Sequence, residues 1–213
     1  GIAAARAGHD VVMTPVDSLY LDYLQTGSPD EPPGRPVQVT LRDVYDFEPV
    51  PAVLDADQRR HILGVQANLW TEHLRTWERQ QHAYSPRVSA LAEIAWSPAE
   101  RRDYADFLAR LPAQLERYRA FGIAHAQTPF EVMAHAEDER AAGRVRVTLD
   151  NPLDYAVRYT VDGSDPHADS PLHEAPIEAP LPLEVRAAAF HGTTALGPAT
   201  RHAFSAASLR VRT

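Results

Sequence analysis

The sequence contains no cysteine and no lysine. Without cysteine, the chain has neither disulfides nor thiolate chemistry, and this absence does not by itself assign a cellular compartment. All 21 basic residues are arginine, against 29 acidic residues, which gives a formal net charge of -8. Because there is no long basic run, we expect no nucleic-acid partner. No apolar run approaches the roughly 20 residues that span a bilayer, so we expect no membrane partner either.

The chain has 213 residues, of which 44% are hydrophobic. That is enough for one large domain or two smaller domains with packed cores. The first residues, Gly1 to Gly8, include no initiator methionine and are typical of the last turn of a helix that ends at a glycine. Because domains rarely begin with the end of a helix, we expect further sequence upstream of Gly1.

The first part of the chain predicts strands and helices in alternation. Val11-Val12-Met13 is a short apolar run before Thr14-Pro15, which indicates a strand buried on both faces. A second strand is predicted at about residues 62–69. Between them, residues 26–36 are rich in proline, glycine and acidic residues, and we expect an irregular surface segment there.

Helices are predicted around these strands. Pro86 precedes an apolar periodicity that continues to Ala95, and a second amphipathic helix runs from Tyr104 to Tyr118 before Gly122. Pro112 lies inside that second helix and should kink or split it. A short helix over residues 41–45 and a polar helical turn over residues 55–60 are also expected.

The pattern changes near residue 129. From Arg144 onward, short alternating runs are separated by turn sequences such as Asp162-Gly163. This pattern indicates a small antiparallel β-sandwich of five to seven strands. The fold class predicted for the whole chain is therefore α/β plus all-β, with domains at 1–128 and 129–213.

One stretch of the first domain suggests a binding site. Residues 64–72 begin as a buried strand and end with Trp70 and Glu72, two positions apart, which an extended strand would place on one side. An aromatic plate beside a carboxylate suits a sugar ring, which has an apolar face and a rim of hydroxyl groups. Alternatively, Trp70 packs in the core and Glu72 is solvated at a strand end.

Four ordered motifs resemble a known family: Tyr20-Leu21-Asp22-Tyr23, then Gly64-Val65-Gln66-Ala67-Asn68-Leu69-Trp70-Thr71-Glu72, then Ser85-Pro86-Arg87, and Ala90-Leu91-Ala92-Glu93-Ile94-Ala95-Trp96. Over about residues 1–125 the chain resembles the C-terminal part of a β-N-acetylhexosaminidase of glycoside hydrolase family 20. The later stretch from Val157 to Pro166 looks like the accessory β-sandwich of bacterial members. The resemblance implies a partial (β/α)8 TIM barrel, its last two β/α units, followed by a small immunoglobulin-like antiparallel β-sandwich.

The resemblance also implies a mechanism. These enzymes are substrate-assisted retaining glycosidases, in which the sugar's own 2-acetamido oxygen is the nucleophile. By position, Tyr20 matches the tyrosine that hydrogen-bonds this oxygen, and Trp70 matches a wall of the acetamido pocket. Asp22 matches a carboxylate that contacts sugar hydroxyls or supports the pocket, and Glu72 matches the acid at the rim near sugar positions four and six. Alternatively, Tyr20 is a loop anchor and Asp22 a turn former.

The family's catalytic Asp-Glu pair is not identified in this chain. Its two Asp-Glu pairs, Asp30-Glu31 and Asp138-Glu139, lack the His-x-Gly-Gly type of surroundings. We therefore expect the isolated chain to be inactive, and expect the general acid to lie in a missing N-terminal part of the barrel. The implied ligand is an N-acetylhexosamine-containing oligosaccharide or glycoconjugate.

No cofactor and no metal are implied. His73 and His82 flank a polar stretch, but nothing supplies a third ligand, so we interpret them as part of a solvated loop. We interpret Arg87, Glu93 and Trp96 as structural residues that form an ion pair and pack the helix.

A second hypothesis is a non-catalytic carbohydrate-binding or interaction module, in which the β-sandwich is the functional part. Calorimetry with N-acetylglucosamine oligomers on residues 129–213 would distinguish the two hypotheses. The sandwich contains scattered aromatic residues and no obvious platform, which favours the hydrolase interpretation. These residues are Tyr155, Tyr159, Phe190 and Phe204.

Overall fold

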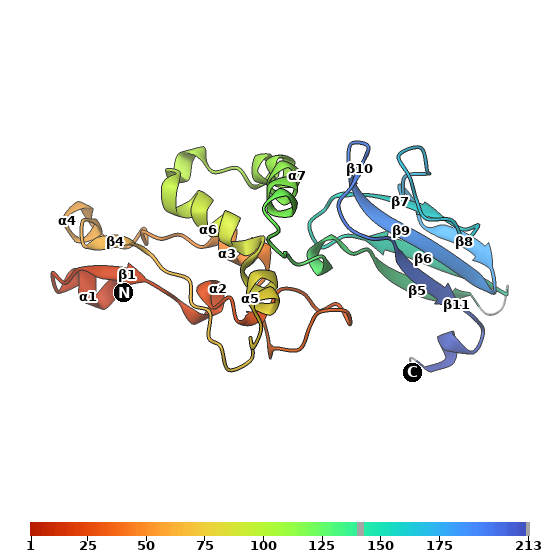
Figure 1. Ribbon diagram of the computed structural model, residues 1–213, viewed down its shortest axis with the longest axis horizontal. Coiled ribbons are helices and arrows are strands. Elements are labelled where there is room, and N and C mark those ends of the chain that lie inside the picture. The colour runs from red at the N-terminus through yellow and green to blue at the C-terminus, as the bar shows by residue number, and fades with distance from the viewer. Residues whose placement is uncertain (140–142, 212–213) are drawn as a thin grey trace. The chain divides into compact units, whose positions relative to one another are not determined.

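The computed structural model describes residues 1–139 and 143–211. The chain divides into two compact units, Gly1–Thr128 and Pro129–Thr213. The first unit combines short parallel strand pairs with helices, and the second consists mainly of antiparallel strands (Figure 1). In the described part of the chain, no helix has both the length and the apolar character needed to cross a membrane.

Two parallel strands, β1 and β4, form one of the two small sheets of the first unit. Strand β1 (Val11–Met13) pairs with β4 (Ile62–Val65), and Figure 1 shows them side by side. The second strand was predicted to reach residue 69, but it ends at Val65. The prediction that the first strand is buried on both faces is also wrong, because Val12 is 48% exposed. Leu63 on β4 is 64% exposed, so no described element covers this part of the sheet.

Seven α-helices lie among the described residues of the first unit. Capping boxes begin the helices predicted at residues 41–45 and 55–60: Thr40 pairs with Asp43, and Asp55 with Gln58. The helices are α1 (Ile2–Arg6), α2 (Val16–Leu19), α3 (Leu41–Asp46), α4 (Ala56–Arg59), α5 (Trp77–Tyr84), α6 (Arg87–Trp96) and α7 (Tyr104–Ala120). Sequence periodicity did not predict α2 and α5, which are short.

Helix α7 is the longest element of the first unit. It continues through Pro112 without a break, so Pro112 does not split the helix, and the alternative of a kink there stays a prediction. Its buried residues repeat at the predicted helical spacing and confirm the amphipathic pattern; they are Phe107, Leu111, Leu115 and Tyr118. Gly122 follows with φ +65°, a conformation that glycine adopts without strain, and the helix ends just before it.

The segment predicted to be irregular is partly ordered as a strand pair. Strand β2 (Tyr23–Leu24) pairs in parallel with β3 (Arg35–Gln38), and residues between them form turns and loops. Through this pairing, the end of the proline-rich segment lies beside the loop that follows α2. Arg35 therefore lies next to residues of the Tyr20–Tyr23 motif, and it pairs with Asp22 of that motif.

The second unit consists of two antiparallel sheets that share one core. One sheet has the order β5-β6-β8, and in the other β9 pairs with β7, β10 and β11. The strands are β5 (Met133–Glu139), β6 (Arg144–Asp150), β7 (Ala156–Thr160), β8 (Ile177–Pro180), β9 (Leu183–His191), β10 (Thr194–Ala195) and β11 (Thr200–Phe204). Val145 and Val147 of β6 pack in one cluster with Val185 and Ala187 of β9, as the alternating pattern predicted.

Two details of the second unit differ from the sequence analysis. Strand β5, which ends with Asp138-Glu139, precedes Arg144, where the alternating runs were predicted to begin. The alternation of Val157, Tyr159 and Val161 predicts a strand that includes Val161, but Val161 follows the end of β7 and is 54% exposed. In both places a strand boundary is shifted because alternation alone does not mark where pairing begins or stops.

Candidate functional site

The four predicted site residues follow the carboxyl ends of β1 and β4. Beyond these strands, the two segments stay hydrogen-bonded to each other. The N–H of Asn68 donates to Leu19 O (2.8 Å), and the carbonyl oxygen of Asn68 accepts from Leu21 N (2.8 Å). A parallel bridge joins Tyr20 to Asn68. Because the two strands are parallel, their carboxyl ends lie at one edge of the sheet, and the segments that follow meet there. In β/α barrels this edge carries the active site.

Three aromatic rings gather at this edge. The ring of Tyr20 lies 6.4 Å from that of Trp70 and 6.0 Å from that of Tyr23. Trp70 is 47% exposed, so it offers an open indole surface and is not a core residue. The predicted strand alternation does not explain the placement of Trp70 and Glu72, because β4 has ended and Thr71-Glu72 forms a turn. Trp70 nevertheless lies beside Tyr20, Glu72 pairs with Arg35, and Tyr23 lies beside both Tyr20 and Arg35.

Arg35 connects the two predicted site carboxylates. Its Nε lies 3.1 Å from Asp22 Oδ2, and its Nη2 lies 3.4 Å from Glu72 Oε1. The guanidinium carbon of Arg35 also lies 5.9 Å from the centre of the Tyr23 ring. Asp22 is fully buried, whereas the Glu72 side chain is 60% exposed. One cation therefore links a buried acid to an exposed acid beside the aromatic cluster.

The ionisation of Asp22 is set by burial against its charged neighbours. Burial raises the pKa of Asp22 above its usual value, and the nearby Glu72 acts in the same direction. Its own backbone N–H, Arg35 and Arg87 lower the pKa, but they do not cancel the effect of burial. The charged form of Asp22 therefore depends on the cations around it.

Arg87 lies beneath this loop and is completely buried. Its guanidinium donates to the carbonyl oxygens of Leu21 (2.6 Å), Tyr23 (3.0 Å) and Val39 (2.6 Å), and its Nε donates to Ala83 O (3.1 Å). Burial lowers the pKa of Arg87 to about 9. Arg87 thus fastens the backbone around Asp22 to the start of α6, and its partners are carbonyl groups, not the carboxylate of an ion pair as predicted.

The other two residues predicted to be structural have different environments. Glu93 does form the expected kind of ion pair, with Arg110 at 2.8 Å across α6 and α7. Trp96 does not pack the helix, because it is 89% exposed at the end of α6. The bulk of a tryptophan predicts burial in general, but the last turn of α6 has no described neighbour over this side chain.

Glu31 belongs to a second polar cluster, whose described hydrogen bonds include none of the four predicted site residues. Its side chain is 3% exposed and is bound by His82 (3.3 Å) and by the hydroxyl of Thr128. His82 lies in α5 and is mostly buried, so the prediction of a solvated loop is wrong for this histidine. Across the described ranges, no three acidic or histidine side chains are grouped as metal ligands would be.

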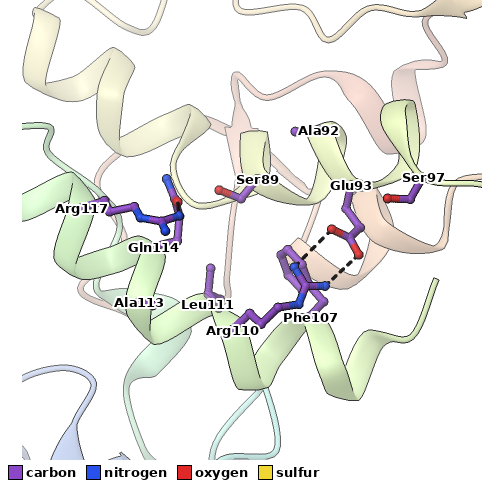
Figure 2. A pocket seen from close by; sticks show the side chains of 10 residues that line it. All are labelled: Ser89, Ala92, Glu93, Ser97, Phe107, Arg110, Leu111, Ala113, Gln114 and Arg117. Carbon is purple, nitrogen blue, oxygen red and sulfur yellow. Dashed lines mark hydrogen bonds and ion pairs between the residues drawn. The ribbon is translucent and has the colours of Figure 1, made fainter. Parts of the chain in front are cut away.

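A groove of about 470 Å³ lies between α6 and α7. Figure 2 shows the Glu93–Arg110 ion pair at one end and Gln114 with Arg117 at the other. Its lining does not include any of the four predicted site residues. The lining residues are Ser89, Ala92, Glu93, Ser97, Phe107, Arg110, Leu111, Ala113, Gln114 and Arg117.

Arg35 and Tyr23 are the members of the cluster to which sequence reasoning gave no role. Tyr23 stood inside a quoted motif and was passed over. Arg35 stands in a proline-rich segment that was interpreted as an irregular excursion, and its position depends on the pairing of β2 with β3. Arg35 carries no local pattern, and the backbone path through the β2–β3 pair brings it to the two acids.

Comparison with known proteins identifies the two units separately. Residues 1–99 match the family model described as glycosyl hydrolase family 20, catalytic domain. Residues 139–200 match the model of the chitobiase/beta-hexosaminidase C-terminal domain. Over residues 1–99 the first unit is thus similar to the catalytic domains of glycoside hydrolase family 20.

Curated relatives carry hexosaminidase names. A beta-hexosaminidase of Porphyromonas gingivalis is 36% identical over 180 residues, which are 84% of this chain and 23% of the relative. A beta-N-acetylhexosaminidase of Cellulomonas fimi is 34% identical over 110 residues, which are 52% of this chain and 22% of the relative. The chain therefore spans about a quarter of the length of these relatives.

Solved structures agree with this assignment. A family 20 beta-N-acetylhexosaminidase from Streptomyces coelicolor A3(2) has 33% identity and a TM-score of 0.53, over 60% of this chain and 26% of that one. A family 20 exo beta-N-acetylglucosaminidase from Vibrio harveyi, solved in complex with N-acetylglucosamine, has 33% identity and a TM-score of 0.55. That match covers 58% of this chain and 20% of the other. A partial barrel followed by a sheet domain fits these neighbours.

Proposed function

We propose that this chain is the C-terminal part of a β-N-acetylhexosaminidase and supplies one side of its sugar site. In this proposal, β1 and β4 are the last two strands of a (β/α)8 barrel, and the second unit is an immunoglobulin-like accessory sandwich. The whole enzyme releases terminal N-acetylhexosamine from β-glycosides by the substrate-assisted route. The observation that carries the proposal is the meeting of Tyr20, Trp70 and the Asp22–Arg35–Glu72 group beyond the carboxyl ends of β1 and β4.

Each residue has a role in this proposal. Trp70 presents its exposed indole to the apolar face of the sugar and to the acetamido methyl group. The Tyr20 hydroxyl donates to the acetamido oxygen, which holds this oxygen in place for its attack on the anomeric carbon. The exposed carboxylate of Glu72 accepts hydrogen bonds from the hydroxyls at the rim of the sugar.

The chain does not supply the proton donor in this proposal. Glu31 is enclosed by its hydrogen bonds to His82 and Thr128, and Asp138-Glu139 lies in β5 of the second unit. Loss of a positioned general acid costs about 10²–10⁴ in rate. We therefore expect the 213-residue chain to bind N-acetylglucosamine without hydrolysing an aryl N-acetylglucosaminide.

Tryptophan fluorescence tests this expectation. The chain has three tryptophans, all of them exposed. The double variant W77F/W96F removes the other two and leaves Trp70 as the only tryptophan that reports on binding. We expect a saturable change with N-acetylglucosamine at millimolar concentration and a much weaker response to glucose, which lacks the acetamido group. The change should also be lost in Y20F, or weakened about tenfold, the loss of roughly one hydrogen bond.

Two results would refute the proposal. Equal responses to N-acetylglucosamine and glucose would mean that Trp70 does not line an acetamido pocket. Hydrolysis of the aryl substrate by highly purified chain, at a rate typical of glycosidases, would mean that the general acid is present after all. The carbohydrate-module alternative has no specific support, because Phe190 is 3% exposed and Tyr155, Tyr159 and Phe204 pack against the core of the second unit.

A further inference from the structure

His173 joins the two sheets of the second unit. It lies in the segment of residues 161–176, which leads from β7 of one sheet to β8 of the other. Its backbone N–H donates to Val157 O of β7 at 2.8 Å, and its imidazole Nε2 accepts from the N–H of Leu149 of β6 at 2.9 Å. His173 is therefore bonded to β7 through its backbone and to β6 through a side chain that can titrate.

The imidazole takes the next place along one edge of β6. Val147 is the last residue of β6 that pairs with β8, where it lies opposite Ile177. Leu149 is two residues further along, and alternate backbone N–H groups of a strand point to the same edge. The ring of His173 therefore continues the hydrogen bonding of β6 at the point where β8 no longer reaches.

The partner of the ring fixes its protonation state. A backbone N–H only donates, so Nε2 of His173 presents a lone pair to Leu149 and the neutral ring carries its hydrogen on Nδ1. In a protonated imidazole both nitrogens are donors. Protonation of Nε2 therefore sets two donors against each other and removes the acceptor of Leu149. Nδ1 is buried without a hydrogen-bond partner in the part of the chain that the structure describes, so a charged ring gains no acceptor there either.

The charges around the ring also favour its neutral form. Burial lowers the pKa of His173, and the nearby Asp150 of β6 acts in the opposite direction. The Asp150 side chain is 51% exposed and pairs with His135 of β5 at 2.8 Å, which weakens its action on the ring. Tyr159 of β7 lies edge-on to the ring at 6.1 Å, and Glu174, the next residue of the segment, is exposed.

We propose that His173 is an acid-sensitive latch, whose neutral ring holds residues 161–176 against β6 and whose protonation releases them. The attachment of this segment to β7 does not titrate, because it consists of backbone hydrogen bonds such as that from Tyr159 N to Pro171 O (3.1 Å). In acid the segment stays on β7 and separates from β6, so the two sheets open at this end. This inference goes beyond the proposed function and does not depend on it.

Amide exchange measures the latch. NMR of the full chain gives the protection of the Leu149 amide from about pH 7.5 to about pH 5. Because the folded pKa of His173 is below the usual 6.5, the stabilisation is fully present above pH 6.5 and is lost as the pH falls from there to the folded value. In that range the protection should fall by up to about tenfold per pH unit, because each opening takes up one proton.

Two variants separate His173 from the other histidines. The side-chain oxygen of H173Q can accept from Leu149 but does not titrate, so this variant should lose the fall and stay within about tenfold of the unaltered chain near neutral pH. H191Q is the matched control, because His191 of β9 is exposed, and it should keep the fall. Burial also lowers the pKa of His202, but His202 is present in all three chains, so the difference between profiles reports on His173.

The tautomer is a readout that needs no variant. The imidazole nitrogen shifts of the unaltered chain at about pH 7.5 should show a hydrogen on Nδ1 of His173 and a lone pair on Nε2. A hydrogen on Nε2 at this pH would overturn the proposal. Level protection of Leu149 across the pH range would do the same, as would a fall that H173Q keeps in full. If H173Q does not fold, the tautomer and the pH profile of the unaltered chain decide.

Discussion

At the scale of single residues, Glu31 illustrates how a buried acid orders a loop. Burial by itself raises the pKa of Glu31, but hydrogen bonds from His82 and Thr128 outweigh this and hold the pKa below its usual value of 4.5. The backbone N–H of Gln25 adds a further hydrogen bond at 3.4 Å. The ionised carboxylate therefore joins the proline-rich segment, α5 and the end of the first unit.

This predicts how the stability of the chain depends on Glu31. Because the folded pKa is lowered, the stabilisation is fully present above pH 4.5 and is lost as the pH falls through the folded value. At pH 7, E31Q should lower the free energy of unfolding by about 1–3 kcal/mol, since buried donors lose a charged acceptor. The difference between E31Q and the unaltered chain should shrink below pH 4.5.

Urea unfolding at several pH values measures this effect. Asp30→Asn is the matched control, because Asp30 is the sequence neighbour of Glu31 and its own side chain is exposed. This substitution should change the free energy of unfolding by less than about 0.5 kcal/mol. An E31Q chain as stable as the D30N chain at pH 7 would show that the Glu31 cluster does not stabilise the fold.

At the scale of elements, Arg87 holds several segments together. Its guanidinium connects the first turn of α6 to the carbonyl groups of Leu21 and Tyr23, and to Val39 just before α3. Arg87 is far from these loop segments in the sequence and lies outside the β2–β3 pair that joins them. A buried cation that satisfies their carbonyl groups therefore defines the path of the loop that carries Tyr20 and Asp22.

Arg87→Met should lower the free energy of unfolding by at least about 3 kcal/mol, because several buried carbonyls lose their donors together. Arg60→Met is the control: the Arg60 side chain is 74% exposed in its pair with Asp57, and such pairs contribute about 0–1 kcal/mol. Chemical denaturation of both variants measures the difference. Equal losses in R87M and R60M would disprove the role assigned to Arg87.

The elements also indicate what a sequence can predict. The amphipathic pattern of α7, the short helices α3 and α4, and the alternation of β6 and β9 follow from local patterns, and the structure confirms them. The pairing of β2 with β3 has no local pattern, so the sequence did not predict that Arg35 lies beside Asp22. The roles of Tyr20, Trp70 and Glu72 came from family resemblance and stay predictions, although the structure brings these residues to one edge.

At the scale of the whole molecule, the two units differ in how they bury apolar side chains. The second unit encloses a cluster with valines such as Val145, Val147 and Val185 fully buried. In the first unit, the sheet of β1 and β4 consists of two short strands on which Val12 and Leu63 are largely exposed. A two-stranded pair without a covered face contributes little stability by itself.

A matched pair of truncations follows from this contrast. Val147→Ala removes two buried methyl groups and should lower the free energy of unfolding of the second unit by about 2 kcal/mol, with faster amide exchange in β6 and β9. Leu63→Ala acts on a side chain that is 64% exposed and should cost less than about 0.5 kcal/mol. Hydrogen exchange under native conditions reports on both variants residue by residue.

A loss of more than about 1.5 kcal/mol in L63A would contradict the exposed position of Leu63, because fully burying a leucine side chain is worth about this much. It would show instead that this strand is covered in solution.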